Sequence, residues 1–167
     1  MIWFYFDANA LVKRYSTETG TELINELFRG VSVTQMTCLT LSVLEVMSIL
    51  VRKKNDGRLS PIAFDQAMIN FRSEVINSKE FAKAAINDIL VMSAFAFIAK
   101  HSINSTDAVI LRSVLNLKNE LDTTGDQLVL LSSDKRLVKA ARNENAIVFD
   151  PEVETLTSLQ QLLATSI

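Results

Sequence analysis

Four acidic residues, in four separated segments of the chain, have the types and positions that metal-dependent chemistry requires. They are Asp7, Glu45, Asp107 and Asp134. Four carboxylates brought together would repel one another unless they bound cations or shifted their pKa values. Carboxylates are hard oxygen donors, and Mg²⁺ is typically held by a few carboxylates, water and substrate phosphate. Such an ion can activate a water and stabilise the leaving oxygen of a phosphodiester.

Each acid taken singly has an ordinary structural explanation. Asp7, Asp107 and Asp134 stand at predicted helix starts, where an aspartate usually only caps free N–H groups. Glu45 lies on a polar stripe of a predicted helix, and such a glutamate is usually just solvated. This stripe contains small serines rather than the usual Lys and Glu, which suits the wall of a cleft. Its other members are Ser42, Ser48 and Arg52.

The elements that must position these acids are strands and helices in alternation. Runs of apolar, β-branched or aromatic residues predict strands at Met1–Phe6, Ser32–Met36, Lys79–Lys83, Gln127–Leu131 and Ala146–Phe149. Helical patterns and stop signals predict helices at Thr19–Phe28, Leu39–Lys54, Ser60–Ile76, Ala84–Lys100, Thr106–Leu117 and Asp134–Arg142, with a helical turn at Leu11–Tyr15. This alternation predicts an α/β fold with a mainly parallel sheet.

The sheet edge tells where a site should lie. In an open parallel sheet, ligands bind beyond the carboxyl ends of the strands. Asp7 directly follows the first predicted strand, and Asp134 follows a later strand after two serines. Two of the four acids are therefore expected at the ligand-binding edge, while Glu45 and Asp107 come from helices.

Other catalytic schemes fit the residue types poorly. His101 is the single histidine and stands at a predicted helix end, so paired-histidine nuclease chemistry is excluded and a Ser–His–Asp triad would depend on it alone. The four glycines are unpaired and form no Gly-rich phosphate loop. Cys38 has no neighbouring His or second Cys, which disfavours a zinc site or a thiol nucleophile.

Size and charge set further limits. A chain of 167 residues suits one domain, which we expect over residues 1–167. The net charge of −2 argues weakly against a nucleic-acid partner, because phosphate binding usually needs a basic surface. Basic residues are clustered, however, and these clusters matter only where they surround an active site. They are Lys13–Arg14, Arg52–Lys54 with Arg58, and Lys135–Arg136 with Lys139 and Arg142.

The start of the chain and its single cysteine bear on location. The first residues, MIWFYFDANA, lack the basic leader of a signal peptide, and an acid occurs at position 7. No uninterrupted apolar run reaches the roughly 20 residues that a membrane helix needs. One cysteine excludes an intrachain disulfide framework and favours a reducing compartment. We therefore expect a cytoplasmic protein without a membrane partner.

Four blocks of the sequence resemble the PIN-domain family, and their order, spacing and flanking residues agree over nearly the whole chain. The blocks are FDANALVKRYSTETG with Asp7, TCLTLSVLEVMSIL with Glu45, INSTDAVIL with Asp107, and LVLLSSDKRLVKAARNENAIVFDP with Asp134. The greatest similarity is to the VapC-type toxins, the ribonucleases of type II toxin–antitoxin systems.

The resemblance implies a three-layer α/β/α sandwich around a mainly parallel central sheet. It implies that the four acids form a pocket for Mg²⁺ or Mn²⁺, with Asn9 and Ser133 as supporting polar groups. The implied activity is endonucleolytic cleavage of RNA. Toxins of this kind are usually homodimers and are neutralised by a small antitoxin protein. The mild acidity of this chain is a departure, so RNA binding must rely on the local basic clusters or on RNA shape.

Two alternative functions remain. A PIN-like domain that no longer cuts would bind RNA or a protein partner, and its acids would serve as helix caps and surface charges. An aspartate-phosphorylating hydrolase would suit Asp7 after a first strand, but that class has a second Asp two residues later, where this chain has Asn9. Metal binding distinguishes the first alternative, and a covalent phosphoaspartate at Asp7 distinguishes the second.

Overall fold

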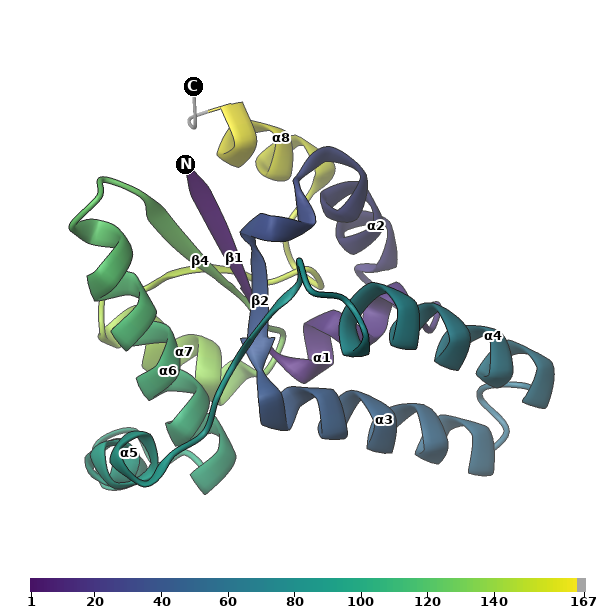
Figure 1. Cartoon of the computed structure of the whole chain (residues 1–167), viewed down its shortest axis with the longest axis horizontal. Helices are drawn as coiled ribbons and strands as arrows, with labels where there is room; N and C mark the ends of the chain where they lie inside the picture. The colour runs from purple at the N-terminus through teal and green to yellow at the C-terminus, as the bar shows by residue number, and fades with distance from the viewer. Residues whose placement is uncertain (165–167) are drawn as a thin grey trace.

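The computed structural model describes residues 1–164, and at its centre lies a five-stranded parallel sheet (Figure 1). The strand order is β3-β2-β1-β4-β5, and each neighbouring pair is parallel. The central strand β1 is wholly apolar and almost entirely buried, as expected for a parallel strand covered on both faces. The strands are β1 (Ile2–Phe6), β2 (Met36–Leu39), β3 (Ala82–Ala84), β4 (Gln127–Leu131) and β5 (Ile147–Phe149).

Helices cover both faces of the sheet. Successive side chains of β1 point to opposite faces. Phe4 and Phe6 therefore enter one hydrophobic cluster, with α1 to α4 and α8, whereas Tyr5 enters a second cluster, with α5 to α7. Figure 1 shows these two groups of helices on either side of the sheet. The helices are α1 (Ala8–Leu11), α2 (Thr21–Gly30), α3 (Thr40–Asn55), α4 (Pro61–Phe71), α5 (Asp88–His101), α6 (Ser105–Asp122), α7 (Lys135–Asn143) and α8 (Leu156–Ala164).

The predicted fold class, a three-layer α/β/α sandwich with a parallel sheet, is confirmed, and most predicted elements shift by a few residues at most. The predicted helix Ser60–Ile76 is α4 followed by a π-helical turn at Arg72–Ile76. The predicted turn at Leu11–Tyr15 is α1 followed by a 3₁₀ turn at Val12–Arg14.

The predicted strand Ser32–Met36 is wrong, because most of that segment is a 3₁₀ turn, Val33–Gln35. The Ser32 hydroxyl accepts a hydrogen bond from the N–H of Thr34 at 3.4 Å, and this local contact holds the turn. Strand β2 begins only at Met36, where all side chains become buried and the backbone pairs with β1.

Other elements also differ from the predictions. The helix predicted from Ala84 begins at Asp88, because Ala84 belongs to β3 and Asn87 caps the helix by accepting from the N–H of Leu90 at 2.9 Å. Helix α8 was not predicted. The domain expected over 1–167 includes residues 165–167, which lie outside the described range.

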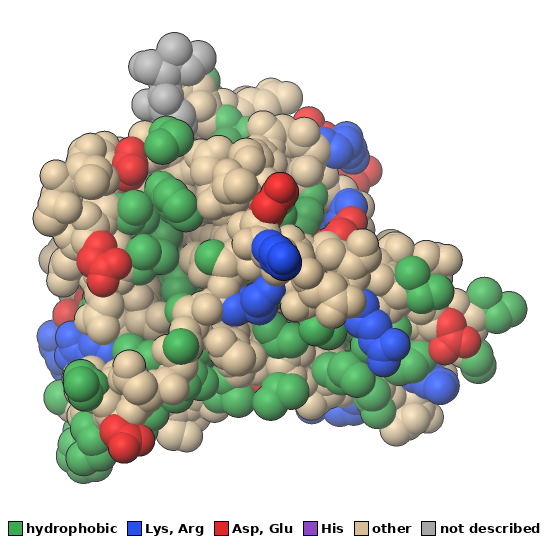
Figure 2. Space-filling model, in the orientation of Figure 1, with side chains coloured by type: hydrophobic (Ala, Val, Ile, Leu, Met, Phe, Trp, Pro, Cys, Tyr) green, Lys and Arg blue, Asp and Glu red, His purple; other side chains and the backbone are tan. Residues whose placement is uncertain are grey.

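Several helices expose large apolar side chains. Figure 2 shows hydrophobic side chains gathered at the lower left, over α5, and at the right, over α3 and α4. Among residues 1–164, no helix is long and apolar enough to cross a membrane. The most exposed of these side chains on α3, α4 and α5 are Leu44, Ile62, Ile69, Ile89, Met92 and Phe95.

Candidate functional site

Asp7 stands where the central strand β1 ends. The register pairs Phe6 with Leu131 of β4, and the N–H of Asp7 continues this pairing by donating to the Leu131 carbonyl at 3.0 Å. The carboxylate of Asp7 then caps α1, with Oδ1 accepting from the N–H of Ala8 at 2.6 Å. Asp7 is therefore held by the sheet on one side and by a helix start on the other.

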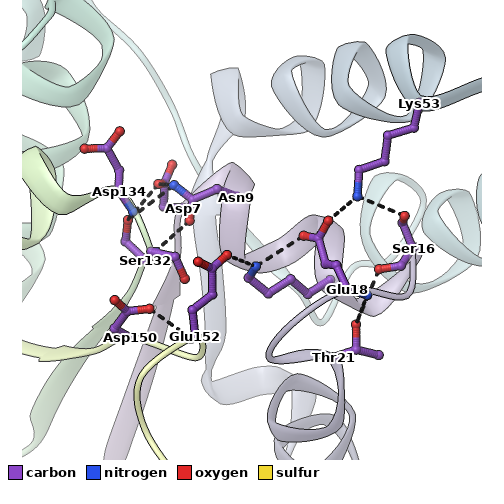
Figure 3. Close-up of polar contacts among 12 residues, drawn as sticks. Asp7, Asn9, Ser16, Glu18, Thr21, Lys53, Ser132, Asp134, Asp150 and Glu152 are labelled. Carbon is purple, nitrogen blue, oxygen red and sulfur yellow. Dashed lines mark hydrogen bonds and ion pairs between the residues drawn. The ribbon is translucent and has the colours of Figure 1, made fainter. Parts of the chain in front are cut away.

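The polar groups around Asp7 come from α1 and from the end of β4 (Figure 3). Asp7 Oδ2 accepts from Asn9 Nδ2 at 2.5 Å and from the Ser132 hydroxyl at 2.9 Å. Asn9 Oδ1 in turn accepts from the backbone N–H of Ser133 at 2.8 Å. Asn9 thus connects the two strand ends, as a supporting residue should.

The structure places the two serines differently from the prediction. Ser133, expected as a supporting polar group, contributes its backbone N–H, while its buried hydroxyl has no hydrogen-bond partner within residues 1–164. The side chain that contacts Asp7 belongs to Ser132, which sequence reasoning missed. The strand pairing could have identified it, since Ser132 follows Leu131 as Asp7 follows Phe6.

Asp134 caps helix α7. Its Oδ1 accepts from the backbone N–H groups of Arg136 and Leu137 at 2.8 and 3.0 Å. The N–H of Asp134 donates to the Ser132 hydroxyl at 3.1 Å, so the same serine contacts both acids at this edge. Asp134 therefore has the helix-capping role considered for it in the sequence, and it also lines the acidic cavity described below.

Asp107 lies in the first turn of α6 and is nearly buried. The capping residue of α6 is Asn104, whose Oδ1 accepts from the N–H of Asp107 at 2.8 Å. Asn104 Nδ2 donates to Asp107 Oδ2 at 2.9 Å, so the capping side chain also fixes the Asp107 carboxylate.

Glu45 projects from the first half of α3 and is partly buried. Ser48 and Arg52, from the same predicted stripe, line the cavity with it. Ser42 does not, because it is fully buried, and its hydroxyl has no partner within the described residues. Of the predicted polar stripe, only Glu45, Ser48 and Arg52 therefore form a wall of the cavity.

One cavity of about 330 Å³ brings the predicted acids together at the carboxyl edge of the sheet. All four acids and Asn9 line it, although they come from four separate segments of the chain. Ser133 does not line it. The lining residues are Asp7, Ala8, Asn9, Glu45, Ser48, Ile49, Arg52, Asp107 and Asp134.

Burial and repulsion between carboxylates make Asp7, Glu45 and Asp107 hard to ionise. Burial raises the pKa of Asp7 to about 7, against the hydrogen bonds from Ser132 and Ala8, and the charges of Glu45 and Asp107 raise it further. Burial also raises the pKa of Asp107 to about 6, the Asp134 charge adds to this, and the nearby Arg136 opposes it. The pKa of Glu45 is raised, first by burial and then by Asp107. A cation in the cavity would offset the repulsion between the carboxylates and favour their ionised forms.

The donor set fits a hard divalent cation in its chemistry, because carboxylate and amide oxygens are what Mg²⁺ and Mn²⁺ prefer. As the side chains lie, however, no three His, Cys, Asp or Glu side chains within residues 1–164 are arranged to hold one metal ion. The Asp134 carboxylate instead caps α7, and the Asp107 carboxylate accepts from the side chain of Asn104, the capping residue of α6. Each of these carboxylates uses one oxygen in the contact, Oδ2 in Asp107 and Oδ1 in Asp134.

A buried ionic network braces the helices that carry the site (Figure 3). Lys13, next to α1, contacts Glu18 at 3.2 Å and Glu152 at 2.6 Å. Lys53, near the end of α3, contacts Glu18 and donates to the Ser16 hydroxyl at 3.0 Å. Both lysine side chains are almost completely buried. The network therefore joins α1, α3 and the loop after β5, and sequence patterns alone gave no sign of it.

The other reactive side chains lie outside the cavity. His101 ends α5, and its Nε2 contacts Glu144 at 2.6 Å. Cys38 is buried in β2, and burial raises the pKa of its thiol to about 12, so it stays protonated at neutral pH. His101 ends a helix, as the sequence predicted.

The sequence matches no protein-family model and no curated protein. The structure is similar to the crystal structure of PAE2754 from Pyrobaculum aerophilum, a PIN-domain protein, with a TM-score of 0.59 and 16% sequence identity. The similarity covers 98% of this chain and 96% of that chain. At this identity it shows the fold alone, and the fold of this chain is PIN-like.

Proposed function

We propose that this chain is a metal-dependent endoribonuclease and the toxin component of a type II toxin–antitoxin pair. One observation carries the proposal. The four carboxylates, Asp7, Glu45, Asp107 and Asp134, converge from separate segments on one cavity at the carboxyl edge of a PIN-like sheet. Buried acids that repel one another are costly to a fold, and they are typical of functional sites.

The residues have separate roles in this proposal. The four acids hold Mg²⁺ or Mn²⁺, which would supply an activated water and stabilise the leaving oxygen of the phosphodiester. Asn9 and Ser132 orient the Asp7 carboxylate and hold it against α1. Burial of Asp7 keeps bulk water from its charge and ties the ionised form to the presence of a cation.

The proposed partners are an RNA substrate, a second copy of this chain and a small antitoxin, all in the cytoplasm. Exposed apolar side chains on α3, α4 and α5 support the homodimer, since large apolar patches usually mark protein interfaces. Light scattering of the purified protein would test the dimer. The antitoxin rests on the resemblance to VapC-type toxins.

The test of the enzyme is cleavage of a mixed RNA pool by the purified protein with Mn²⁺, with Mg²⁺ and with EDTA. Asp7→Asn is expected to abolish cleavage while keeping the fold, because Asn also caps helices. Asp65→Asn is the matched control, since Asp65 is an exposed acid on α4 outside the cavity. Metal-dependent cutting that survives in Asp7→Asn would refute the proposal.

A second candidate is a PIN-like domain that binds RNA or a protein without cutting. Two observations favour it. The acids within residues 1–164 form no ready group of metal ligands, and Asp7 and Asp134 cap helices. Titration calorimetry with Mn²⁺ separates the candidates. Binding by the wild type that is lost in Asp7→Asn supports the nuclease, and no binding by either supports the second candidate.

A further inference from the structure

A second cavity, of about 390 Å³, lies between the end of α5 and the exposed face of α7. Its lining contains three basic side chains and no acidic one. This composition is unexpected in a chain with a net charge of −2. The lining residues are Lys100, His101, Ser102, Arg136, Lys139, Ala140 and Asn143.

The helical repeat explains which cations face this cavity. Arg136, Lys139 and Asn143 follow one another at steps of three and four residues, so they share one face of α7. Lys135 and Arg142, on the same helix, are exposed but line neither this cavity nor the acidic one. Helix α7 therefore carries two cations on the cavity face and two elsewhere.

The basic side chains of the cavity differ in whether they form ion pairs. Lys100 and His101 both contact the Glu144 carboxylate, at 2.5 and 2.6 Å. Arg136 and Lys139, in contrast, form no ion pair with any residue in 1–164, and both are exposed. Two positive charges without an ion-pair partner in residues 1–164 thus face a hollow large enough for a phosphate and its sugar.

The start of α7 contributes a lining residue to each of the two cavities. Asp134 lines the acidic cavity, and Arg136, two residues later, lines the basic one. The Asp134 carboxylate accepts the backbone N–H of Arg136 at 2.8 Å, and the Arg136 charge is close enough to lower the pKa of Asp107. A strand of RNA with a phosphate at the acidic cavity would therefore have a neighbouring phosphate near Arg136.

We propose that the cavity formed by Lys100, Arg136 and Lys139 binds a backbone phosphate of the RNA next to the one at the acidic cavity. The inference rests on the proposed function, because it takes RNA as the ligand. It answers the difficulty raised by the charge of the chain, since four carboxylates repel a polyanion and the attraction must come from a local basic site.

The experiment measures binding of a fluorescein-labelled single-stranded RNA, long enough to span both cavities, by fluorescence anisotropy in EDTA over a range of KCl. The variants are Arg136→Ala/Lys139→Ala and the matched control Lys135→Ala/Arg142→Ala. Both remove two cations from α7, so their net charges are equal. Thermal melting of each variant verifies that the fold is kept.

The cavity variant is expected to bind roughly tenfold to a hundredfold more weakly than the wild type, as the loss of two charged contacts predicts. Its slope of log affinity against log salt should fall by about 0.7, the value for the loss of one phosphate contact on a single strand. The control variant should stay within about threefold of the wild type. An equal loss in both variants, or no RNA binding by the wild type, would overturn the inference.

Cleavage by the same proteins with Mn²⁺ separates this inference from the proposed function. If the binding difference is found and no protein cuts RNA, the basic cavity stands and the nuclease fails. If the wild type cuts RNA and Arg136→Ala/Lys139→Ala has unchanged binding and an unchanged KM, the nuclease stands and the basic cavity fails. A raised KM with unchanged kcat in the cavity variant supports both.

Discussion

The hydroxyl of Ser132 donates a 2.9 Å hydrogen bond to the carboxylate of Asp7, although the two residues are 125 positions apart. The contact exists because β1 and β4 are parallel neighbours in a register that puts their next residues side by side. Both side chains are almost fully buried, so neither is free to turn elsewhere. The bond lowers the pKa of Asp7 against the effect of burial, and it fixes the direction of the carboxylate.

Replacing Ser132 by Ala should weaken Mn²⁺ binding and RNA cleavage by about tenfold to a hundredfold, the range typical of groups that orient a metal ligand. The lost donor also raises the pKa of Asp7 further, so the pH midpoint of Mn²⁺ binding should move upward. Calorimetry between pH 5 and 9 measures both effects. Ser133→Ala is the control, because that hydroxyl has no partner within residues 1–164. Equal effects of the two substitutions would contradict the role given to Ser132.

The stability of the metal-free protein should depend on pH through Asp7. Its pKa is about 7 in the fold and 3.8 ordinarily, so the folded state holds this proton more tightly than the unfolded chain. The contribution of Asp7 to the free energy of unfolding is therefore retained below about pH 4 and lost as the pH rises through about 7.

Asp7→Asn cannot ionise and should escape this loss. Relative to the wild type, the variant should be more stable at pH 8 than at pH 5 by roughly 3 kcal/mol, because about two pH units separate pH 5 from the pKa of Asp7 and each is worth about 1.36 kcal/mol. Urea unfolding in EDTA across this pH range measures the difference. Asp107 titrates in both proteins, so its contribution largely cancels in the difference between their free energies of unfolding. A gap between the proteins that does not change with pH would show that Asp7 is not protonated in the fold.

Glu18→Gln should lower the free energy of unfolding by about 2 kcal/mol, because the buried ammonium group of Lys53 loses its only carboxylate in residues 1–164. The effect lies below that of a fully buried pair because Glu18 is partly exposed. Chemical unfolding measures it. Glu22→Gln, an exposed glutamate on α2 without an ion pair in the described residues, should have almost no effect. Adding Lys53→Met to Glu18→Gln should recover stability, and a further loss would contradict this account.

Gly20→Ala should destabilise the protein by more than about 2 kcal/mol, because a left-handed backbone and a steric clash act together. Gly20 has φ of +89°, and an added Cβ would stand 2.4 Å from the carbonyl oxygen of Pro151. Gly125 also has positive φ, +78°, but open space around it, so Gly125→Ala should cost only about 1 kcal/mol. Thermal melting of both variants tests the difference, and equal losses would show that the approach of Pro151 is unimportant.

The sequence alone determined the fold class and the edge of the sheet at which the acids lie. Strand β1 and residues 128–131 of β4 are buried on both faces, so their sequences are uninterrupted apolar runs. Asp7 follows β1 directly, and Asp134 follows β4 after two serines. Helix α3 was also predicted closely, because its pattern is long and a stop signal at Gly57 follows it. These features depend on local spacing, which a sequence displays.

Only the tertiary structure decided which polar groups meet. Nothing in the local pattern distinguishes Ser132 from Ser133, or Ser42 from Ser48, because the difference arises from strand register and helix rotation against neighbours far away in the chain. The same holds for Lys53, whose burial depends on Glu18 at its side. Local spacing predicts which way a side chain points from its own element, but its partner is set by packing between elements, and packing is where the chemistry of this site is assembled.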